Sequence, residues 1–491
     1  MIMKRFVLAL DQSTSGTKAL LLDAAGRLLD RRDLPHEQII NDRGWVSHDP
    51  EEIYRNTVQV LQTLITENGV AHDEIAALGI SNQRETSVIW SRKTGKPLNN
   101  AVVWQCTRSS GICETLSAYG EEIRRRTGLR LSPYFPASKF AWLIRNSSPL
   151  PSEELCLGTV DAWLVFRLTG GRVFATDYSN ASRTQLLNLE TLSWDPEICG
   201  WFGIDPVSLP EVRFSDGDFG QTDLEGFLAC PVPIRGVLGD SHAALFAQGC
   251  LSPGMVKATY GTGSSVMMNI GNSPVRTSDA LVTSLAWGMN GTVHYVLEGN
   301  INYTGSVIKW LVDDVKLLDA SRDAGILAEQ ADPSDRTYIV PAFTGLGAPY
   351  WNDSVRAMIC GMSRTTGQKE IVRAAEECIV YQICDVLFRM QEESGITIRE
   401  LRVDGGPTRD RFLMQFRSDM LDLPVCVPEK AELSGIGAGC CAGIAAGLYP
   451  EDVVLQGTPL IYEPVIDGSL RKEKLEGWHE AVRLLLHGGK E

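Results

Sequence analysis

Asp11-Gln12-Ser13-Thr14-Ser15-Gly16-Thr17-Lys18 stands between two apolar runs, and Thr259-Tyr260-Gly261-Thr262-Gly263-Ser264-Ser265 stands between two further apolar runs in the second half of the chain. Each stretch predicts a tight hairpin whose small residues leave backbone N–H groups and hydroxyls around a concave nest. Such a nest suits phosphate, and Asp11 at the strand end could hold a divalent metal through water. Either stretch alone is equally typical of an ordinary glycine hairpin. The two together favour phosphate binding and an internal duplication.

Length and composition fit a globular protein of two domains. The chain has 491 residues, of which 44% are hydrophobic, and this is enough for two cores in domains of more than roughly 200 residues each. The twelve cysteines show no Cys-x-x-Cys pair, and the adjacent Cys440 and Cys441 suit neither a disulfide framework nor a zinc knuckle. We therefore expect a cytoplasmic protein with reduced thiols.

Neither a targeting segment nor a nucleic-acid partner is expected. Lys4 and Arg5 precede only a short apolar run before Asp11, and no apolar run of about 18 residues occurs elsewhere. The net charge of −15, from 46 basic and 61 acidic residues, would repel a nucleic-acid backbone. We expect a soluble protein without membrane or nucleic-acid partners, and ATP held by local loops and a metal remains compatible with this charge.

Strand-like apolar runs alternate with amphipathic helices, which predicts an α/β fold with sheets covered by helices. One helix is predicted to begin after Asp49 as the cap, with Pro50 in the first turn and Glu52 completing a capping box. A second is predicted over residues 368–393, where apolar residues recur at helical spacing before Gly395. Both helices are expected to have structural roles.

The duplicated turns divide the chain into two halves. The segment 249–254 is rich in glycine and turn residues, so we predict one domain over residues 1–248, another over 249–491, and a cleft between them.

The small-residue run at 434–447 would be a poor isolated helix. It is interpreted mainly as a buried helix crowded against a sheet, and alternatively as backbone lying close to a flat ligand such as adenine.

A polar turn follows one buried strand in the segment 77–90. It places Arg84 and Glu85 at a strand end, where sites of α/β folds tend to form. The pair could be an ordinary ion pair. An adjacent cation and carboxylate can also bind several hydroxyls of a polyol, because together they donate and accept hydrogen bonds.

Asp240 ends another apolar strand and precedes an apolar helix. Transfer of a phosphoryl group from ATP to an alcohol needs a carboxylate that accepts the hydroxyl proton, magnesium, and donors around the γ-phosphate. Asp240 is therefore the candidate base, and a helix N-cap is its structural alternative. His242 nearby is either a polar contact to substrate or an ordinary surface histidine, since no second ligand at metal spacing accompanies it.

The sequence resembles the FGGY carbohydrate kinases over nearly its whole length, and among them it most resembles the members that phosphorylate glycerol. The motifs occur in the family's order and comprise GWVSHDP (44–50), SNQRET (81–86), VWQC (103–106), PYF (133–135), GTVDAWL (158–164), TDYSNASRT (176–184), YGTG (260–263), PAFTGLGAPYW (341–351) and VDGG (403–406). The resemblance implies two ribonuclease H-like domains of the actin, hexokinase and chaperone ATPase superfamily around a central cleft. It also implies ATP as a substrate, Mg²⁺, and a homodimer.

The resemblance assigns roles residue by residue. Asp240 would be the general base, and substrate contacts would come from Arg84, Glu85, Trp104, Tyr134, Ser241 and the position of Ser265. Asp11 would hold magnesium through water. The ATP phosphates and nucleotide would be bound by Thr14, Ser15, Lys18, Thr262, Gly263, Gly305, Gly406 and Asp410.

Four departures from the glycerol-phosphorylating pattern bear on the substrate and its regulation. Ser241-His242 replaces Gln-Gln, Ser265 replaces a phenylalanine that packs on the glycerol carbons, and Ser13 replaces a glycine. Loss of the aromatic ring removes roughly 1.5–3 kcal/mol of apolar burial and leaves space for another hydroxylated carbon. Residues 224–232 also lack the glycine/arginine loop through which some bacterial members bind fructose 1,6-bisphosphate.

The leading hypothesis is thus an ATP- and magnesium-dependent kinase acting on a terminal hydroxyl of a small polyol or sugar. Glycerol is the first candidate, and erythritol, ribulose and xylulose are alternatives. A non-catalytic nucleotide switch or sugar-sensing pseudokinase is the second hypothesis, because the fold supports such uses. Retention of Asp11, Arg84, Glu85 and Asp240 favours the kinase.

Overall fold

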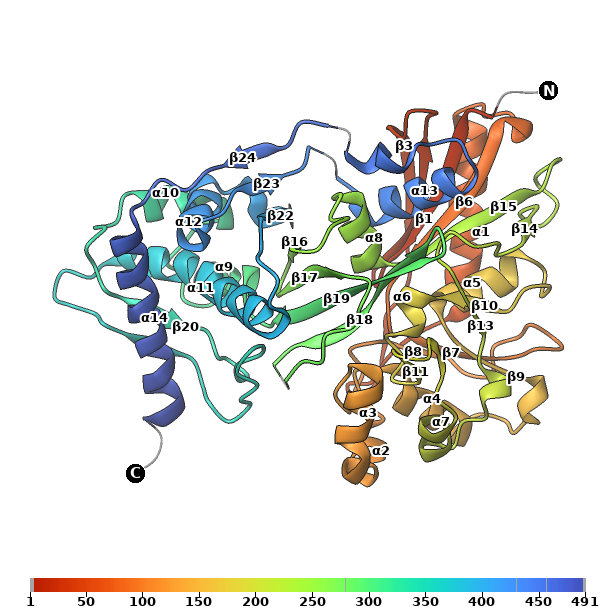
Figure 1. Cartoon of the computed structure of the whole chain (residues 1–491), viewed down its shortest axis with the longest axis horizontal. Coiled ribbons are helices and arrows are strands. Elements are labelled where there is room, and N and C mark those ends of the chain that lie inside the picture. Colours follow the sequence, from red (N-terminus) through yellow and green to blue (C-terminus); the bar gives the residue numbers. More distant parts are fainter. Residues whose placement is uncertain (1–3, 279, 430, 456, 489–491) are drawn as a thin grey trace.

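Two large sheets form the centres of the two halves of the molecule (Figure 1). The computed structural model describes residues 4–488 except 279, 430 and 456. The N-terminal sheet has the order β14-β15-β6-β1-β2-β3, with strands β1 (Phe6–Gln12), β2 (Gly16–Leu22), β3 (Leu28–Pro35), β6 (Ile75–Asn82), β14 (Gln221–Thr222) and β15 (Val232–Gly239). The C-terminal sheet has the order β18-β19-β17-β16-β22-β23-β24, with strands β16 (Met255–Tyr260), β17 (Ser264–Gly271), β18 (Val282–Met289), β19 (Thr292–Ile301), β22 (Glu400–Gly405), β23 (Val425–Val427) and β24 (Leu460–Tyr462).

The two sheets repeat one topology. In the first, β1 pairs antiparallel with β2 and parallel with β6, and β6 pairs parallel with β15. In the second, β16 pairs antiparallel with β17 and parallel with β22, and β22 pairs parallel with β23. This repeat of strand order and direction agrees with the internal duplication predicted from the two turns.

Both predicted hairpins are confirmed. The first turn joins β1 to β2 with Gln12 opposite Thr17, and the second joins β16 to β17 with Tyr260 opposite Ser264. Ser13 has a φ outside the left-handed region, so the backbone at this position accommodates a serine without strain.

Smaller sheets complete the molecule. A five-stranded sheet in the N-terminal half has the order β4-β5-β8-β7-β9, with strands β4 (Ile39–Ile40), β5 (Val46–His48), β7 (Ser87–Ser91), β8 (Ala101–Val102) and β9 (Leu155–Thr159). Three two-stranded pairs are formed by β10 (Ala175–Asp177) with β13 (Glu211–Arg213), β11 (Leu187–Asn188) with β12 (Ser193–Trp194), and β20 (Tyr338–Val340) with β21 (Met358–Cys360).

The α-helices pack around these sheets. They are α1 (Pro50–Glu67), α2 (Ser110–Thr115), α3 (Gly120–Thr127), α4 (Pro136–Arg145), α5 (Val160–Leu168), α6 (Tyr178–Ala181), α7 (Pro196–Phe202), α8 (Asp240–Ala247), α9 (Gly305–Asp313), α10 (Ala324–Glu329), α11 (Gln368–Ser394), α12 (Arg411–Leu421), α13 (Leu433–Ala445) and α14 (Gly468–His487). Short 3₁₀ turns connect several of them, including η6 (Gly406–Arg409) after β22.

The two predicted helices are confirmed, with one local difference. The Asp49 carboxylate accepts a hydrogen bond from the backbone N–H of Glu51 at the start of α1, and α11 ends at Gly395 in the left-handed conformation. The predicted capping box of α1 is wrong, because the Glu52 carboxylate accepts instead from the backbone N–H of Glu37 at 3.2 Å. The Glu52 carboxylate, which the local sequence pattern assigned to the helix cap, is thus engaged in a tertiary hydrogen bond.

The small-residue run forms α13, which comes from the C-terminal half but packs on the N-terminal sheet and α8 (Figure 1). A Cβ atom on Gly79 of β6 would lie 2.2 Å from the carbonyl oxygen of Ala438, and one on Gly437 would lie 2.0 Å from that of Ala243. Glycine is therefore required by the close approach of the backbones. The main interpretation of this run, a buried helix crowded against a sheet, is confirmed.

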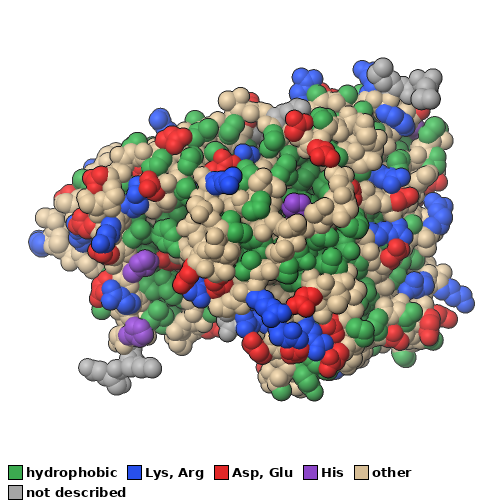
Figure 2. All heavy atoms as spheres, in the orientation of Figure 1, with side chains coloured by type: hydrophobic (Ala, Val, Ile, Leu, Met, Phe, Trp, Pro, Cys, Tyr) green, Lys and Arg blue, Asp and Glu red, His purple; other side chains and the backbone are tan. Residues whose placement is uncertain are grey.

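Acidic and basic side chains are intermixed over both halves on the face shown in Figure 2. None of the helices in the described part of the chain is both long and apolar enough to cross a membrane.

Candidate active site

Three predicted residues converge at one edge of the N-terminal sheet. Asp11 lies near the end of β1, Arg84 follows β6, and Asp240 follows β15, and these are neighbouring parallel strands. Their carboxyl ends therefore meet, as in ligand sites of open α/β sheets. The Arg84 Nε atom lies 3.2 Å from Asp240 Oδ1.

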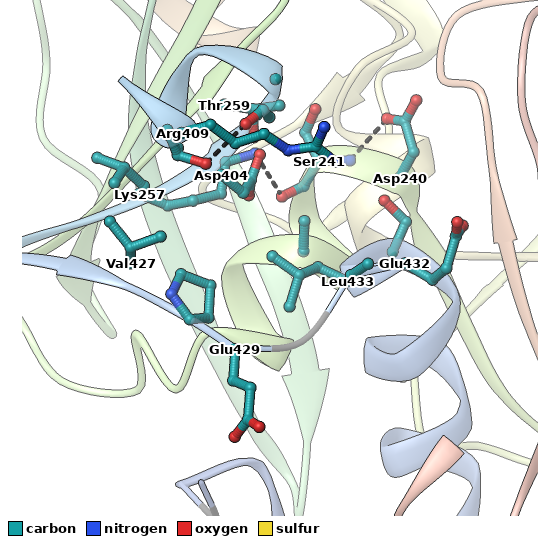
Figure 3. A pocket seen from close by; sticks show the side chains of 18 residues that line it. Asp240, Ser241, Lys257, Thr259, Asp404, Arg409, Val427, Glu429, Glu432 and Leu433 are labelled. Carbon is teal, nitrogen blue, oxygen red and sulfur yellow. Dashed lines mark hydrogen bonds between the residues drawn. The ribbon is translucent and has the colours of Figure 1, made fainter. Parts of the chain in front are cut away.

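A cleft of about 510 Å³ opens beside Asp240 (Figure 3). Asp240 and Ser241 from α8 line one side of it, and residues of the C-terminal half line the rest, including Lys257, Asp404, Gly406 and Arg409. Glu432 and Leu433, at the start of α13, also contribute. Of the predicted site residues, Asp240, Ser241 and Gly406 line this cleft directly.

The Asp240 carboxylate is accessible from the cleft. Its side chain is 35% exposed, and Oδ1 accepts a hydrogen bond from the Ser241 backbone N–H at 2.6 Å. Asp240 is the first residue of α8, and the N-cap position belongs to Gly239. The helix-cap alternative for Asp240 is therefore wrong, and the carboxylate is available for chemistry.

Arg84 and Glu85 belong to a buried ionic network that sequence reasoning missed. Arg84 donates to both oxygens of Glu298, at 2.9 and 3.2 Å, and Arg183 lies between Glu298 and Glu85, at 2.9 and 2.7 Å. Glu298 belongs to β19, in the other half of the molecule. A lone carboxylate within the apolar run 295–299 was the only local signal for it. Arg183 belongs to the TDYSNASRT motif (176–184), but the resemblance assigned no role to this arginine.

Trp104, Tyr134 and Thr14 form a second group. The Trp104 indole N–H donates to Thr14 Oγ1 at 3.0 Å, and the Trp104 and Tyr134 rings pack edge to face with centroids 5.6 Å apart. Lys139 donates to the backbone carbonyl of Tyr134 at 2.5 Å, which fixes the segment that carries the ring. Thr14, in the first turn predicted to bind phosphate, is thus hydrogen-bonded to Trp104, the predicted apolar wall of the substrate site.

Asp11 and Lys18 meet an acidic residue from the C-terminal half. Lys18 Nζ lies 2.6 Å from Glu432 Oε2. Burial raises the pKa of Asp11 to about 6, and the carboxylates of Asp240 and Glu432 add to this rise while Lys18 opposes it. Ser15 of the same turn is exposed.

The donor set at Asp11 fits Mg²⁺. A divalent cation would favour the ionised form of this buried carboxylate. No group of three or more acidic, histidine or cysteine side chains among the described residues could hold a metal alone. In phosphate-transfer sites, however, Mg²⁺ usually takes one or two protein carboxylates together with water and phosphate oxygens.

The second turn is held against the start of α9. The Thr262 carbonyl accepts from the Ser306 backbone N–H at 3.1 Å, and the Gly305 N–H donates to the Gly261 carbonyl at 3.2 Å. A Cβ on Gly305 would lie 2.5 Å from that carbonyl, so only glycine allows this approach. Thr262, Gly263 and Gly305, predicted separately, are therefore neighbours.

Asp410, Ser265 and His242 also lie outside the lining of the cleft. Asp410 caps α12 by accepting from the Leu413 N–H at 3.0 Å, and Ser265 is paired within the sheet between β16 and β19. The Ser265 hydroxyl is buried and has no hydrogen-bond partner. The surface alternative for His242 is wrong, because the ring is fully buried with Nε2 3.4 Å from Ser284 Oγ. Burial and Arg84 lower the pKa of His242 well below its ordinary value.

Comparison with known proteins identifies the family. Residues 6–247 match the N-terminal domain of the FGGY family of carbohydrate kinases, and residues 256–446 match its C-terminal domain. Similar sequences include glycerol kinase 1 of Thermotoga maritima, 45% identical over 98% of this chain and 99% of its own length, and glycerol kinase of Carboxydothermus hydrogenoformans, 43% identical over 98% of both chains. Glycerol kinase of Plasmodium falciparum, solved with ADP, superposes with a TM-score of 0.92 at 33% identity, covering 99% of each chain. The chain therefore belongs to the FGGY family of carbohydrate kinases and is an ATP-dependent kinase of two actin- and hexokinase-like domains.

Proposed function

We propose that this protein transfers the γ-phosphoryl group of ATP to a terminal hydroxyl of glycerol. The observation that carries the proposal is the Asp240 carboxylate, partly open to the cleft and 3.2 Å from the Arg84 guanidinium at the carboxyl ends of adjacent parallel strands. Relatives more than two-fifths identical over nearly the whole chain are named glycerol kinases, which supports glycerol as the first substrate.

Asp240 acts as the general base in this proposal. The substrate hydroxyl gives its proton to the carboxylate as its oxygen bonds to the γ-phosphorus, and the bond from that phosphorus to the bridging oxygen of ADP breaks. Arg84, Glu85 and Tyr134 bind the remaining hydroxyls, and Trp104 covers the carbon chain. Positioning of the two reactants supplies much of the rate enhancement, because the site contributes little covalent chemistry of its own.

The two turns hold the nucleotide phosphates from opposite sides. Thr14, Ser15 and Lys18 face the transferred phosphoryl group, and the ATP phosphates and nucleotide contact Thr262, Gly263, Gly305, Gly406 and the segment at Asp410. Lys18 reaches a phosphate by exchanging its partner Glu432 for it. Bound Mg²⁺, held by Asp11 through water, would neutralise phosphate charge.

A four- or five-carbon polyol or ketose is the alternative substrate. The unpartnered, buried hydroxyl of Ser265 favours it, because a buried polar group without a partner costs free energy that a substrate hydroxyl would recover. Serine at positions 241 and 265 makes the pocket more polar than the pattern of the glycerol-phosphorylating members. A homodimer and a cytoplasmic location complete the proposal, and the twelve cysteines, all in the described part of the chain, are free thiols, which suits a reducing compartment.

Release of ADP tests the proposal. Purified protein with ATP and Mg²⁺ is assayed with glycerol, erythritol, ribulose or xylulose, and with no acceptor. We expect glycerol to raise ADP formation well above the rate with water alone. No stimulation by any of the four would contradict the function, whereas stimulation by a larger acceptor only would select the alternative substrate.

A further inference from the structure

We propose that Glu298 is a positioning residue through which the C-terminal half holds Arg84 beside the catalytic Asp240. The inference rests on the proposed function, because it concerns the same substrate site. Glu298 does not line the cleft, and it acts through the arginines that it binds.

Glu298 is a fully buried and fully occupied carboxylate. Its side chain has no exposed surface, Oε2 accepts a hydrogen bond from Arg84 Nη1 at 2.9 Å, and Oε1 accepts one from Arg84 Nη2 at 3.2 Å. Arg183 Nη1 forms an ion pair with Oε2 at 2.9 Å. Asn300 Nδ2 also donates to Oε1 at 3.2 Å. Burial alone would raise the pKa of Glu298, but the two guanidinium groups hold it well below its ordinary value. The carboxylate of Glu298 is therefore ionised at neutral pH.

The bidentate pair orients the Arg84 guanidinium relative to Asp240. Both Nη atoms bind Glu298, and Nε is the atom that approaches Asp240 Oδ1, at 3.2 Å. The stem of Arg84 lies against the backbone at Gly239, where a Cβ would stand 2.7 Å from Arg84 Cγ. Arg84 is thus fixed at both ends, by a carboxylate from one half and by a glycine next to the catalytic residue in the other.

The same carboxylate reaches the second predicted substrate ligand. Arg183 binds Glu298 through Nη1 and Glu85 through Nε at 2.7 Å, and its side chain is 1% exposed. The order of charges is Asp240, Arg84, Glu298, Arg183 and Glu85, alternating in sign. Only Glu298 comes from the C-terminal half, so it ties both substrate ligands to the position of that half.

Removal of the negative charge has a specific consequence. A guanidinium freed from Glu298 turns its Nη atoms toward the nearest carboxylate, and for Arg84 this is Asp240. A base engaged by two N–H groups is less available to the substrate hydroxyl. Displacement of a positioned group by about 1 Å can cost roughly 100-fold in rate.

The test compares Glu298→Gln and Glu298→Asp with the wild-type protein in steady-state kinetics. We expect Glu298→Gln to lower kcat by roughly 10- to 100-fold and to raise the KM for the polyol, with little change in the KM for ATP. Hydrolysis of ATP without polyol should persist, since the phosphate turns are intact. Glu298→Asp keeps the charge and should recover part of the loss, and it also serves if Glu298→Gln does not fold.

Glu377→Gln is the matched control. Glu377 is another buried carboxylate of the C-terminal half, bound to Arg373 at 2.8 Å and Lys474 at 3.2 Å, and it does not line the cleft. We expect Glu377→Gln to lower the unfolding temperature. Any change in the KM for the polyol should be matched by a similar change in the KM for ATP.

Either of two results would overturn the inference alone. The first is unchanged kinetic constants in Glu298→Gln. The second is that Glu298→Gln lowers the unfolding temperature and raises the KM values for polyol and ATP to the same extent as Glu377→Gln does. A wild-type protein stimulated by no polyol would overturn the proposed function, and the inference with it.

Discussion

At the scale of single residues, the account depends most on Asp240. Replacement by asparagine keeps the shape of the side chain but removes the proton acceptor, so we expect Asp240→Asn to lower turnover by roughly 10²- to 10⁴-fold. ATP binding should change little, because both phosphate turns remain. Steady-state kinetics and equilibrium titration with ATP measure the two effects separately.

Glu429→Gln is a suitable control for this substitution. Glu429 is an exposed carboxylate at the rim of the same cleft, and its side chain points away from Asp240 in Figure 3. It should leave turnover near the wild-type value. Turnover in Asp240→Asn equal to that of this control would exclude Asp240 as the base.

Ser265 tests the size of the substrate pocket. A phenylalanine here restores roughly 1.5–3 kcal/mol of possible apolar burial, so Ser265→Phe should shift the ratio of kcat/KM values toward glycerol and away from five-carbon acceptors by about 10-fold or more. Ser265→Ala removes the hydroxyl without filling the space and should shift the ratio much less. Identical ratios in both variants would place Ser265 outside the substrate pocket.

Sequence predicted the residues that stand next to a recognisable strand end. Asp11, Arg84 and Asp240 each follow or end an apolar run, so local pattern and motif located them. Glu298 lies inside a strand, and its partner Arg84 is 214 positions away in the sequence. Long-range ion pairs of this kind leave almost no local pattern.

At the scale of secondary-structure elements, Asp385 is one of the acidic residues that hold α14 in place. Asp385 of α11 accepts from Trp478 Nε1 at 2.7 Å, from His479 Nε2 at 2.9 Å and from the Tyr350 hydroxyl at 2.9 Å. The hydrogen bond to Asp385 raises the pKa of His479 above its ordinary value. The protonated imidazole therefore stabilises the attachment of α14.

This linkage predicts a pH-dependent effect of His479→Gln. The folded-state pKa is raised, so the stabilisation is fully present below the unfolded-state pKa, near 6.5, and is lost as pH rises through the folded value. The substitution should reduce the free energy of unfolding more at about pH 5.5 than at about pH 8.5, by less than about 1 kcal/mol because the ring is 45% exposed. Denaturant unfolding at both pH values measures this, and an equal loss at both would contradict it.

Helices with clear capping residues and regular apolar spacing were predicted closely. The elements against which helices pack were not predicted. α1 and α11 follow from capping residues and apolar spacing, whereas the capping box at Glu52 failed because Glu37 competes for its carboxylate. Composition indicated that α13 is buried. It could not indicate that α13 packs on the N-terminal sheet, because that contact depends on Gly79 and Gly236, which are remote in sequence.

At the scale of the whole molecule, duplication gives each half one glycine/hydroxyl turn, between β1 and β2 in the first and between β16 and β17 in the second. The cleft is lined by residues of both halves, and ion pairs from Lys18 to Glu432 and from Arg84 to Glu298 join the two halves. Exclusion of water from the site would prevent it from competing with the alcohol for the γ-phosphoryl group. We therefore expect transfer to the alcohol to be faster than hydrolysis of ATP.

Transfer of labelled phosphate distinguishes a kinase from a nucleotide switch most directly. The wild-type protein is incubated with γ-labelled ATP and Mg²⁺, with and without glycerol, and the labelled products are separated. We predict that glycerol accelerates loss of ATP and that the label appears in a glycerol phosphate in amounts equal to the ADP formed. Label found only in inorganic phosphate, at the same slow rate with glycerol, with a five-carbon acceptor and with neither, would contradict the account.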